Sequence, residues 1–376
     1  MLHLAGIHAV VFESRSRSYV EQRQRAGILE QSTVDVLRQV GASWRLDREG
    51  IPHDGVELLF EGQRHRIDFP SITNGSRVMI YAQTEICKDL IELQLKEGGP
   101  LFFETEVIGI EGADSPAPSI RFRRQGSATD EMISCDYVAG CDGFWGVSRA
   151  SFPPSLCRTF ERSYPFSWLG ILADVPPSSN ELIYARHNRG FALLSMRSPT
   201  VSRNYIQVPD NTEAESWGED EIWDELEKRT GTTDGWKLNR GPIMQKSVTP
   251  MRSFVHEPMQ YGQVFLAGDA AHIVPPTGAK GLNLAIGDVI ALANALKQRY
   301  HSGTTDLLQA YSDTCLRRIW QAERFSYDMT NLFHTDPTAT TFQSRLELSR
   351  LRRIVASESA RTDLALSYTG CWPEGA

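Results

Sequence analysis

Apolar and polar positions predict alternating strands and helices in the first part of the chain. The run HAVVFE (8–13) is typical of a buried parallel strand that ends at Glu13, and MLHLAG before it resembles the last turn of a helix closed by Gly6. The spacing then predicts a helix over 28–40, a hairpin over 55–69 and a helix over 84–95. Strands follow in FFETEVIGIEG, SIRFRRQG and SCDYVAGCDG, which completes the pattern of an α/β domain.

The pattern changes in the middle of the chain. From residue 164 to 252, short β segments separated by turn signals predict a mainly antiparallel sheet, accompanied by one amphipathic helix in WGEDEIWDELEKRTG. QVFLAGDAAH then has the composition of a buried strand, and a long helix is expected to start inside GLNLAIGDVIALANALKQRY. The remainder is predicted to be largely helical to about residue 366. We therefore expect three parts, at 1–160, 161–252 and 253–376.

Composition narrows the class of protein. The chain has 376 residues, a net charge of −8 and 23% charged residues, which is ordinary for a globular protein and argues against a nucleic-acid-binding surface. The basic stretch RLELSRLRR is expected to be a solvated helix face. None of the six cysteines forms a C-x-x-C pair and no metal-ligand set is apparent, which favours a reduced, cytoplasmic location without a membrane anchor or metal.

Glu13 lies where a dinucleotide-binding unit needs an acid. Such a unit has a glycine turn and a helix N-terminus at the pyrophosphate, and a carboxylate about 20 residues further on that binds the ribose hydroxyls. Counting back from Glu13 reaches a position before Met1, so the first strand and the glycine loop are missing from this chain. The glycines in AGCDGFWGVSR have a different spacing. We expect that the recorded start lies downstream of the true one; the alternative is a genuine truncated product.

Three motifs in order resemble one enzyme family. Glu13, then CDGFWGVSR (141–149), then GDAAHIVPPTGAKGLNLAIGD (268–288) resemble the single-component flavoprotein aromatic hydroxylases. RAGILEQ, ELIYARHNRGFAL, SMRS, PMRSFVHEPMQYG and LRRIWQAERFSYDMT extend the likeness over nearly the whole chain, toward members that hydroxylate 4-hydroxybenzoate. The resemblance implies a Rossmann-like FAD-binding domain, an inserted mainly antiparallel β-sheet substrate domain and a helical C-terminal region with a flavin-contacting helix.

The third motif has the chemistry of a flavin site. A carboxylate at Asp269 can accept hydrogen bonds from sugar-like hydroxyls, prolines stiffen the following turn, and a helix N-terminus favours negative charge. The resemblance implies FAD contacts from Glu13, Arg23, Arg25, Gln83, Asp142, Asp269, Gly281, Leu282 and Asn283. It assigns NAD(P)H to Arg15, Tyr19, Arg23 and Arg252, and the choice between NADPH and NADH stays open. Trp145 departs from the family pattern, which often has a histidine there.

The inserted sheet is expected to hold the substrate. Ser195 and Arg197 lie two apart on a strand, hence on one face, and a guanidinium can pair with a benzoate carboxylate through two hydrogen bonds. The resemblance makes Ser195 and Tyr205 hydroxyl partners of that substrate. It also implies a proton relay through Tyr184 and Tyr368 with His53 at its outer end, and a backbone carbonyl contact from Pro276. His53 is expected to keep an ordinary pKa near working pH.

The resemblance therefore implies an activity. 4-Hydroxybenzoate would be hydroxylated at its 3-position to 3,4-dihydroxybenzoate with NAD(P)H and O2, through a flavin C4a-hydroperoxide, by a protein that is expected to form a homodimer. Two alternatives stay open. One is a hydroxylase of another phenolic acid, and the other is a truncated, FAD-deficient pseudoenzyme that binds aromatic acids.

Overall fold

A large mixed sheet forms the middle of the molecule. The computed structural model describes residues 1–23 and 27–371. Eight strands have the order β19-β16-β12-β15-β14-β13-β4-β5, and all neighbours are antiparallel except β13 and β4. Their bounds are β4 Gly55–Phe60, β5 Gln63–Asp68, β12 Arg158–Ala173, β13 Leu182–Ala185, β14 Ala192–Met196, β15 Ser202–Pro209, β16 Ile243–Glu257 and β19 His272–Ile273. The predicted antiparallel sheet and the 55–69 hairpin are both present, and the hairpin lies at the edge of this same sheet.

Two smaller sheets each contain a further parallel strand pair. β1 (Val11–Phe12) pairs in parallel with β7 (Leu101–Phe102), and β11 (Val138–Gly140) pairs in parallel with β18 (Val264–Leu266), which β17 (Gln260–Tyr261) extends. Two antiparallel sheets complete the set: β8 Thr105–Glu111, β9 Ser119–Arg124 and β10 Glu131–Ser134, and β2 Ile28–Glu30, β3 Ile51–His53 and β6 Val78–Ile80. The α/β fold class is confirmed, while the division at residues 160 and 252 stays a prediction.

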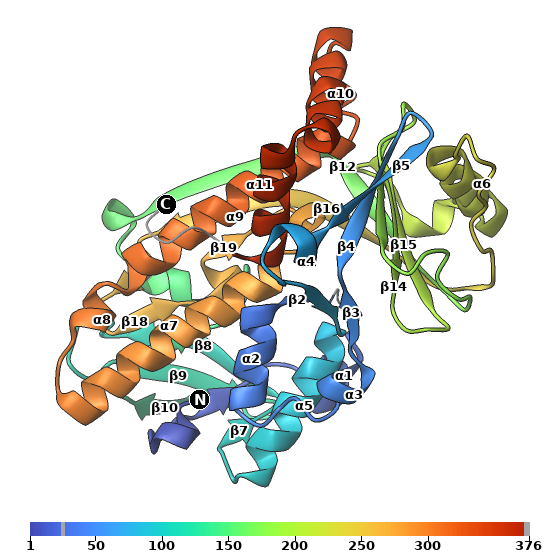
Figure 1. Ribbon diagram of the computed structural model, residues 1–376. Coiled ribbons are helices and arrows are strands. Elements are labelled where there is room, and N and C mark those ends of the chain that lie inside the picture. The colour runs from blue at the N-terminus through green and yellow to red at the C-terminus, as the bar shows by residue number, and fades with distance from the viewer. Residues whose placement is uncertain (24–26, 372–376) are drawn as a thin grey trace.

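Two long helices, α7 and α9, run side by side across one face of the molecule (Figure 1). α10 and α11 stand at one end of α9, and α6 covers the outer part of the large sheet (Figure 1). The helices are α1 Arg17–Gln22, α2 Gln31–Gln39, α3 Leu46–Glu49, α4 Phe69–Ile72, α5 Gln83–Lys96, α6 Glu219–Thr230, α7 Gly281–Ser302, α8 Asp306–Gln309, α9 Tyr311–Phe333, α10 Thr341–Ala356 and α11 Glu358–Thr369. The predicted helix opening at Gly281 and the helical C-terminal region are confirmed.

Two local predictions were wrong. The segment before Glu13 pairs in parallel as expected, but it is not buried, since Val10 and Val11 are exposed and β7 is its hydrogen-bonded neighbour in the described sheet. The predicted helix over 28–40 starts only at Gln31, because Ile28–Glu30 instead forms β2 against β6 and buries Leu29. Both errors arise because a short apolar run does not reveal which neighbour will pair with it.

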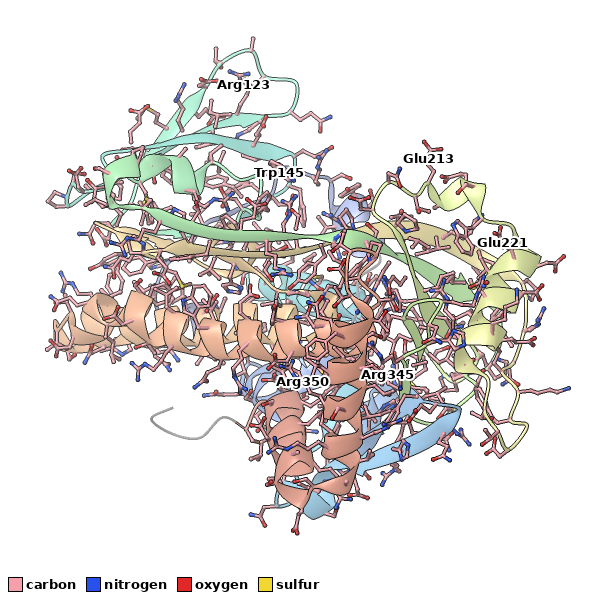
Figure 2. The ribbon with its side chains drawn as sticks, turned by 90° about the horizontal axis from the view of Figure 1, so that it is seen from above. Arg123, Trp145, Glu213, Glu221, Arg345 and Arg350 are labelled. Atoms are coloured by element: carbon pink, nitrogen blue, oxygen red, sulfur yellow. The ribbon has the colours of Figure 1, made fainter. Side chains whose placement is uncertain are left out.

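The exposed charges lie where a solvated surface is expected. Figure 2 shows Arg345 and Arg350 on α10, and at the right of the view Glu221 on α6 and Glu213 shortly before that helix. Arg345 and Arg350 are exposed, as predicted for the basic stretch. Beneath this surface, one apolar cluster joins the large sheet to α9, α10 and α11 and contains Tyr184, Tyr205 and Tyr368. The tyrosines proposed to meet the substrate therefore lie in the core.

Candidate active site

The hydroxyl groups of Tyr184 and Tyr368 meet in the core. Tyr184 lies on β13 and Tyr368 on α11, and their oxygens are 2.8 Å apart. Both side chains are almost fully buried, and the rings stand edge-on at a centroid distance of 6.2 Å. Burial raises the pKa of both phenols above the ordinary value, so both stay protonated at neutral pH. A hydroxyl can donate and accept at once, so this pair can pass a proton.

Tyr205 lies on the same face of the sheet as Tyr184. The register pairs Tyr184 with Leu193 on β14, and Leu193 with Tyr205 on β15, so the three side chains form one row across three strands. Burial also raises the pKa of Tyr205, while the nearby Arg203 and Arg197 lower it. The row brings two of the predicted substrate contacts together.

Arg197 is a largely buried cation with weak compensation inside the protein. Its side chain is 17% exposed, and the carboxylate of Glu85 lies 3.9 Å away. That carboxylate is already held by Arg45 at 2.6 Å and Lys88 at 3.0 Å. Burial, followed by Arg203, lowers the pKa of Arg197. Burying a cation is costly without a close anion, so an acidic ligand would stabilise this side chain.

The other predicted substrate groups are already engaged in local bonds. The Ser195 hydroxyl on β14 donates to the Arg203 carbonyl. The Pro276 carbonyl accepts the Ala279 N–H at 3.0 Å in the short turn Pro276–Gly278. A hydroxyl can still accept, and a carbonyl oxygen has a second lone pair. Both groups therefore keep capacity for one further hydrogen bond.

His53 does not have the ordinary pKa that we expected. It is 1% exposed at the end of β3, and burial lowers its pKa to about 4, although Glu181 and Asp54 act in the opposite direction. Neither ring nitrogen has a hydrogen-bond partner among the described residues. The imidazole is therefore neutral at pH 7, and its place at the end of a relay stays a prediction.

Lys280 links the proline turn to the tyrosine pair. Its buried ammonium donates to Glu30 at 2.6 Å and to the Tyr368 carbonyl at 2.9 Å, and it lies 5.3 Å from the Phe325 ring centre. The Phe325 ring is in turn 6.1 Å from that of Tyr368. The sequence analysis did not single out Lys280 or Glu30. The only signal was a lysine inside PPTGAKGLN, because Glu30 lies 250 residues away.

The start of α7 has free backbone donors. No side chain caps its N-terminus, and the first intrahelical bond runs from the Leu284 N–H to the Lys280 carbonyl. The N–H groups of Gly281, Leu282 and Asn283 precede this bond, so they are the unsatisfied donors of the first turn. The Asn283 side chain is used structurally, since its carbonyl accepts from the Glu30 N–H and the Thr33 hydroxyl. This helix end favours an electron-rich ligand.

The acids of the second and third motifs differ in what they contact. Asp269 lies in the turn Gly268–Ala270, where its side chain is exposed and has no partner among the described residues. Gly268 has φ +62°, and an added Cβ would lie 3.2 Å from Ala285. Asp142 instead accepts from the Ser148 N–H at 2.8 Å and the Ser148 hydroxyl at 2.9 Å. Asp269 is therefore free to bind a ligand, whereas Asp142 shapes its own loop.

The N-terminal site residues form a separate surface group. Glu13 accepts the Arg15 N–H at 2.7 Å, and the Arg15 guanidinium stacks on Tyr19 at 5.4 Å. Arg23 is exposed and its carbonyl accepts from Thr84, next to the half-buried Gln83 that begins α5. Arg25 lies outside the described residues. The structure thus places three of these predicted residues, Glu13, Arg15 and Tyr19, next to one another.

Phe144 lies between two guanidinium groups. Arg252 is 4.6 Å and Arg149 is 5.0 Å from its ring centre, and Arg149 donates to the Ala270 carbonyl at 2.7 Å. Trp145, next in sequence, is 87% exposed on the molecular surface (Figure 2). Arg252 also lies 3.8 Å from Glu161. The Phe144 ring thus lies next to Arg252, which was predicted to bind NAD(P)H, and to Arg149, which contacts the turn that carries Asp269.

Two further properties concern the described residues as a whole. No group of three or more His, Cys, Asp or Glu side chains in 1–23 and 27–371 is arranged to hold a metal ion. Within the same residues, the helices are too short or too polar to cross a membrane.

Several known proteins are similar to this chain in sequence or in fold. The family described as FAD binding domain matches residues 1–326. A p-hydroxybenzoate hydroxylase of Acinetobacter baylyi is 48% identical over 370 residues, which cover 98% of this chain and 91% of that protein. The crystal structure of a p-nitrophenol 4-monooxygenase from Pseudomonas putida has a TM-score of 0.82 at 16% identity and covers 98% of this chain and 92% of its own.

A second solved structure agrees on the fold. The complex of aklavinone-11 hydroxylase with FAD and aklavinone has a TM-score of 0.72 at 18% identity, over 89% of this chain and 66% of that one. Such low identities show the fold alone. The family match and the close relative go further, and together they establish that this chain belongs to the FAD-dependent aromatic monooxygenases, enzymes that use FAD with NAD(P)H as co-substrate.

Proposed function

We propose that this enzyme hydroxylates 4-hydroxybenzoate at the 3-position, with NAD(P)H and O2, and releases 3,4-dihydroxybenzoate. The observation that carries the proposal is the pair of buried phenols of Tyr184 and Tyr368, whose oxygens are 2.8 Å apart. Tyr205 belongs to the same apolar cluster, and the charge of Arg197 acts on its hydroxyl, so a buried cation lies near this cluster. 4-Hydroxybenzoate carries a hydroxyl, which suits the tyrosine pair, and at the opposite end of its ring a carboxylate, which suits Arg197. The 48% identical p-hydroxybenzoate hydroxylase supports the same substrate.

The substrate would be held at both ends. Arg197 pairs with the carboxylate through two charge-assisted hydrogen bonds, and Ser195 and Tyr205 add hydroxyl contacts. At the other end, the substrate hydroxyl donates to Tyr184, and Tyr184 donates to Tyr368. Each tyrosine passes on its own proton as it takes one, so both stay neutral, and the last proton would leave through His53 to water. The substrate is then a phenolate, which makes the ring carbon next to its oxygen more nucleophilic. In a second arrangement, the substrate hydroxyl would turn its one proton to the Pro276 carbonyl and accept from Tyr184 instead.

The residues around the proline turn fit FAD. The partner-free Asp269 carboxylate suits a polyhydroxyl chain, and the uncapped N–H groups at Gly281, Leu282 and Asn283 suit an electron-rich ring edge. Glu13, Arg23, Gln83 and Asp142 are the further candidates, together with Arg25. When bound, FAD would accept hydride from the nicotinamide and activate oxygen. Lys280 and Glu30 hold the turn against Tyr368, which keeps this chemistry next to the substrate.

Three finer statements belong to the same proposal. NAD(P)H would lie across the cations Arg15, Arg23 and Arg252, with Tyr19 against its rings, because the nucleotide carries several phosphate charges. The enzyme would act as a homodimer. It would work in the cytoplasm, in keeping with six cysteines that form no disulfide among the described residues.

The test is oxygen uptake with a panel of hydroxybenzoates, together with identification of the product. We expect 4-hydroxybenzoate to give the highest kcat/KM, with 3,4-dihydroxybenzoate as product and consumption of NAD(P)H and O2 in equal amounts. A higher kcat/KM for another phenolic acid would replace the proposed substrate and leave the enzyme class unchanged. Binding of 4-hydroxybenzoate without any oxygen uptake, in protein reconstituted with FAD, would contradict the proposed activity.

A further inference from the structure

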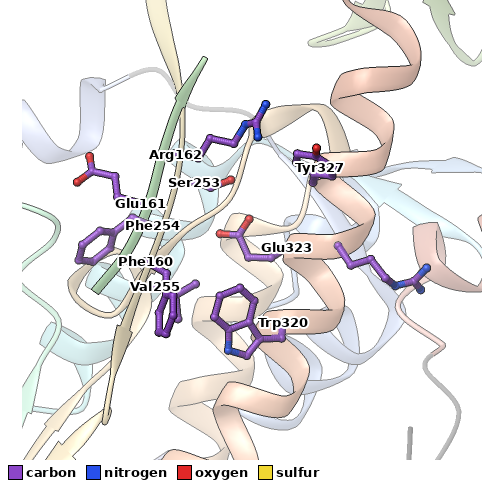
Figure 3. A pocket seen from close by; sticks show the side chains of 10 residues that line it. Phe160, Glu161, Arg162, Ser253, Phe254, Val255, Trp320, Glu323 and Tyr327 are labelled. Carbon is purple, nitrogen blue, oxygen red and sulfur yellow. The ribbon is translucent and has the colours of Figure 1, made fainter. Parts of the chain in front are cut away.

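An apolar groove lies between the long strands of the large sheet and helix α9 (Figure 3). Its volume is about 290 Å³, enough for a small organic molecule. One wall is formed by Phe160, Glu161 and Arg162 on β12 and by Ser253, Phe254 and Val255 on β16, and the other by Trp320, Glu323, Arg324 and Tyr327 on α9. The four residues on α9 are spaced at i, i+3, i+4 and i+7, so they share one helix face.

Three large aromatic side chains of this groove stay accessible. Phe160, Trp320 and Tyr327 are 42%, 41% and 39% exposed, which is unusual for rings of this size. The rings of Phe160 and Trp320 meet edge-on at 5.3 Å. The Trp320 indole N–H is already bonded to Glu257 at 2.7 Å, so its ring is fixed in the wall. Rings of this kind offer flat faces to an apolar or cationic ligand.

A buried carboxyl group points into the groove. Glu323 is only 6% exposed, and its Oε1 has no hydrogen-bond partner among the described residues. Figure 3 shows this carboxyl group between the helix and the strands, facing Ser253. Burial raises the pKa of Glu323 to about 7, although Ser253 and the Phe254 backbone favour its ionised form. An acceptor oxygen left open in a buried place is costly, so its presence calls for a ligand that donates to it.

The other charged side chains around the groove have contacts of their own. Arg162 stacks on Tyr164 and Tyr327 at 5.2 and 5.1 Å. Arg324 lies 4.0 Å from Asp328 on its own helix, and Glu161 lies 3.8 Å from Arg252. Glu323 has no ion pair with any described residue. Of the two carboxyl groups that line the groove, Glu161 therefore has a cation beside it among the described residues, and Glu323 does not.

The groove is separate from the candidate active site. Phe325, two residues after Glu323, points to the opposite side of α9, where its ring lies 6.1 Å from that of Tyr368. None of the residues assigned to substrate, FAD or NAD(P)H lines the groove. Arg252, assigned to NAD(P)H, touches only its rim through Glu161.

We propose that this groove is a second small-molecule site, which takes an organic ammonium ion with an aromatic body. The ammonium group would donate to Glu323 Oε1, and the aromatic body would lie against Trp320 and Phe160. A neutral or acidic aromatic molecule lacks the charge that the buried carboxylate requires. This site would bind a cation, whereas the site around Arg197 would bind an anion.

The experiment is calorimetric titration of the FAD-loaded enzyme with 2-phenylethylammonium, saturated with 4-hydroxybenzoate so that the active site is filled. We expect one-to-one binding that Glu323→Gln weakens at least about tenfold, as expected for loss of a charge-assisted hydrogen bond. Glu161→Gln is the matched control, because it removes a carboxylate of the same groove that is half exposed, and binding should be unchanged. The neutral analogue 2-phenylethanol should bind much more weakly than the amine.

A second measurement needs no variant. Binding of the amine by the unaltered enzyme should strengthen from about pH 6 to about pH 8, because only the ionised carboxyl attracts it and the amine stays charged over this range. This decides the case if Glu323→Gln does not fold. Three results would overturn the proposal: no binding of the amine, equal binding by Glu323→Gln, or sedimentation showing that a second copy of the chain covers the groove and excludes the amine.

Discussion

The substrate side and the cofactor side of the candidate active site are built in different ways. On the substrate side, Tyr184 and Tyr368 come from positions 184 residues apart and meet in the core. On the cofactor side, Asp269 and the start of α7 lie within one short stretch of sequence, and Asp269 is exposed. Buried polar groups interact strongly because little water screens them, whereas an exposed carboxylate exchanges one hydrogen bond for another. Changes on the substrate side should therefore affect the reaction more than changes on the cofactor side.

The largest effect is expected from Tyr184→Phe. The ring keeps its packing, but the hydroxyl that links the substrate to Tyr368 is lost, so the rate of 3,4-dihydroxybenzoate formation should fall about 100-fold. Product formation measured against pH would show the loss at neutral pH, with partial recovery at alkaline pH, where the substrate phenol ionises by itself. Tyr164→Phe is the control, since this tyrosine is also buried and its hydroxyl makes a long 3.4 Å contact with Ser253, away from the Tyr184–Tyr368 pair. An equal loss in both variants would contradict the relay.

Arg197→Lys should have the second-largest effect. Lysine keeps the charge but lacks the planar fork, so we expect KM for 4-hydroxybenzoate to rise about 30-fold, or about 2 kcal/mol, with a smaller change in kcat. Steady-state kinetics measure both constants. Arg240→Lys, which alters an exposed arginine paired with Glu227, should leave KM unchanged. An unchanged KM in Arg197→Lys would mean that the substrate carboxylate binds elsewhere.

Asp269→Asn should have a smaller effect, and on the cofactor alone. Loss of a charged acceptor should weaken FAD binding about tenfold, measured by fluorescence titration, while activity at saturating FAD stays close to the original. Asp313→Asn changes an exposed acid of α9 and serves as the comparison. If FAD affinity were untouched by the change at Asp269, the third motif would not contact the cofactor in the way proposed here.

The smallest effect is expected from His53 and concerns stability. Its folded pKa of about 4 lies below the unfolded value, so its contribution is fully present above about pH 6.5 and is lost as the pH falls toward 4. Lowering the pH from about 8 to about 6 should reduce the free energy of unfolding by about 1 kcal/mol through this residue. Urea unfolding should show that this pH-dependent loss of stability is smaller in His53→Gln. His8 is exposed, so His8→Gln should lose as much stability as the original protein. If the free energy of unfolding depended on pH in the same way in all three proteins, folding would not lower the pKa of His53.

The same contrast explains which site residues could be found from the sequence. The helix start at Gly281 and the carboxylate at Asp269 lie within one motif, so the sequence pointed to both, and the resemblance implied their contacts with FAD. Arg197 and Tyr184 were identified through a family resemblance, and their approach to Tyr205 depends on strand register. Lys280 and Glu30 were missed because their ion pair joins residues 250 positions apart. The low pKa of His53 was missed because burial sets it.

The sequence by itself determined the α/β class, the antiparallel insert, the hairpin and the helix that begins at Gly281, since each rests on short-range periodicity and turn chemistry. It also identified the three motifs that mark the family. Only the tertiary structure decided that the segment before Glu13 is exposed, that Ile28 starts a strand, and that Glu323 Oε1 is buried without a donor among the described residues. These properties depend on which distant segment packs against a side chain, and periodicity along one segment carries no information about that partner.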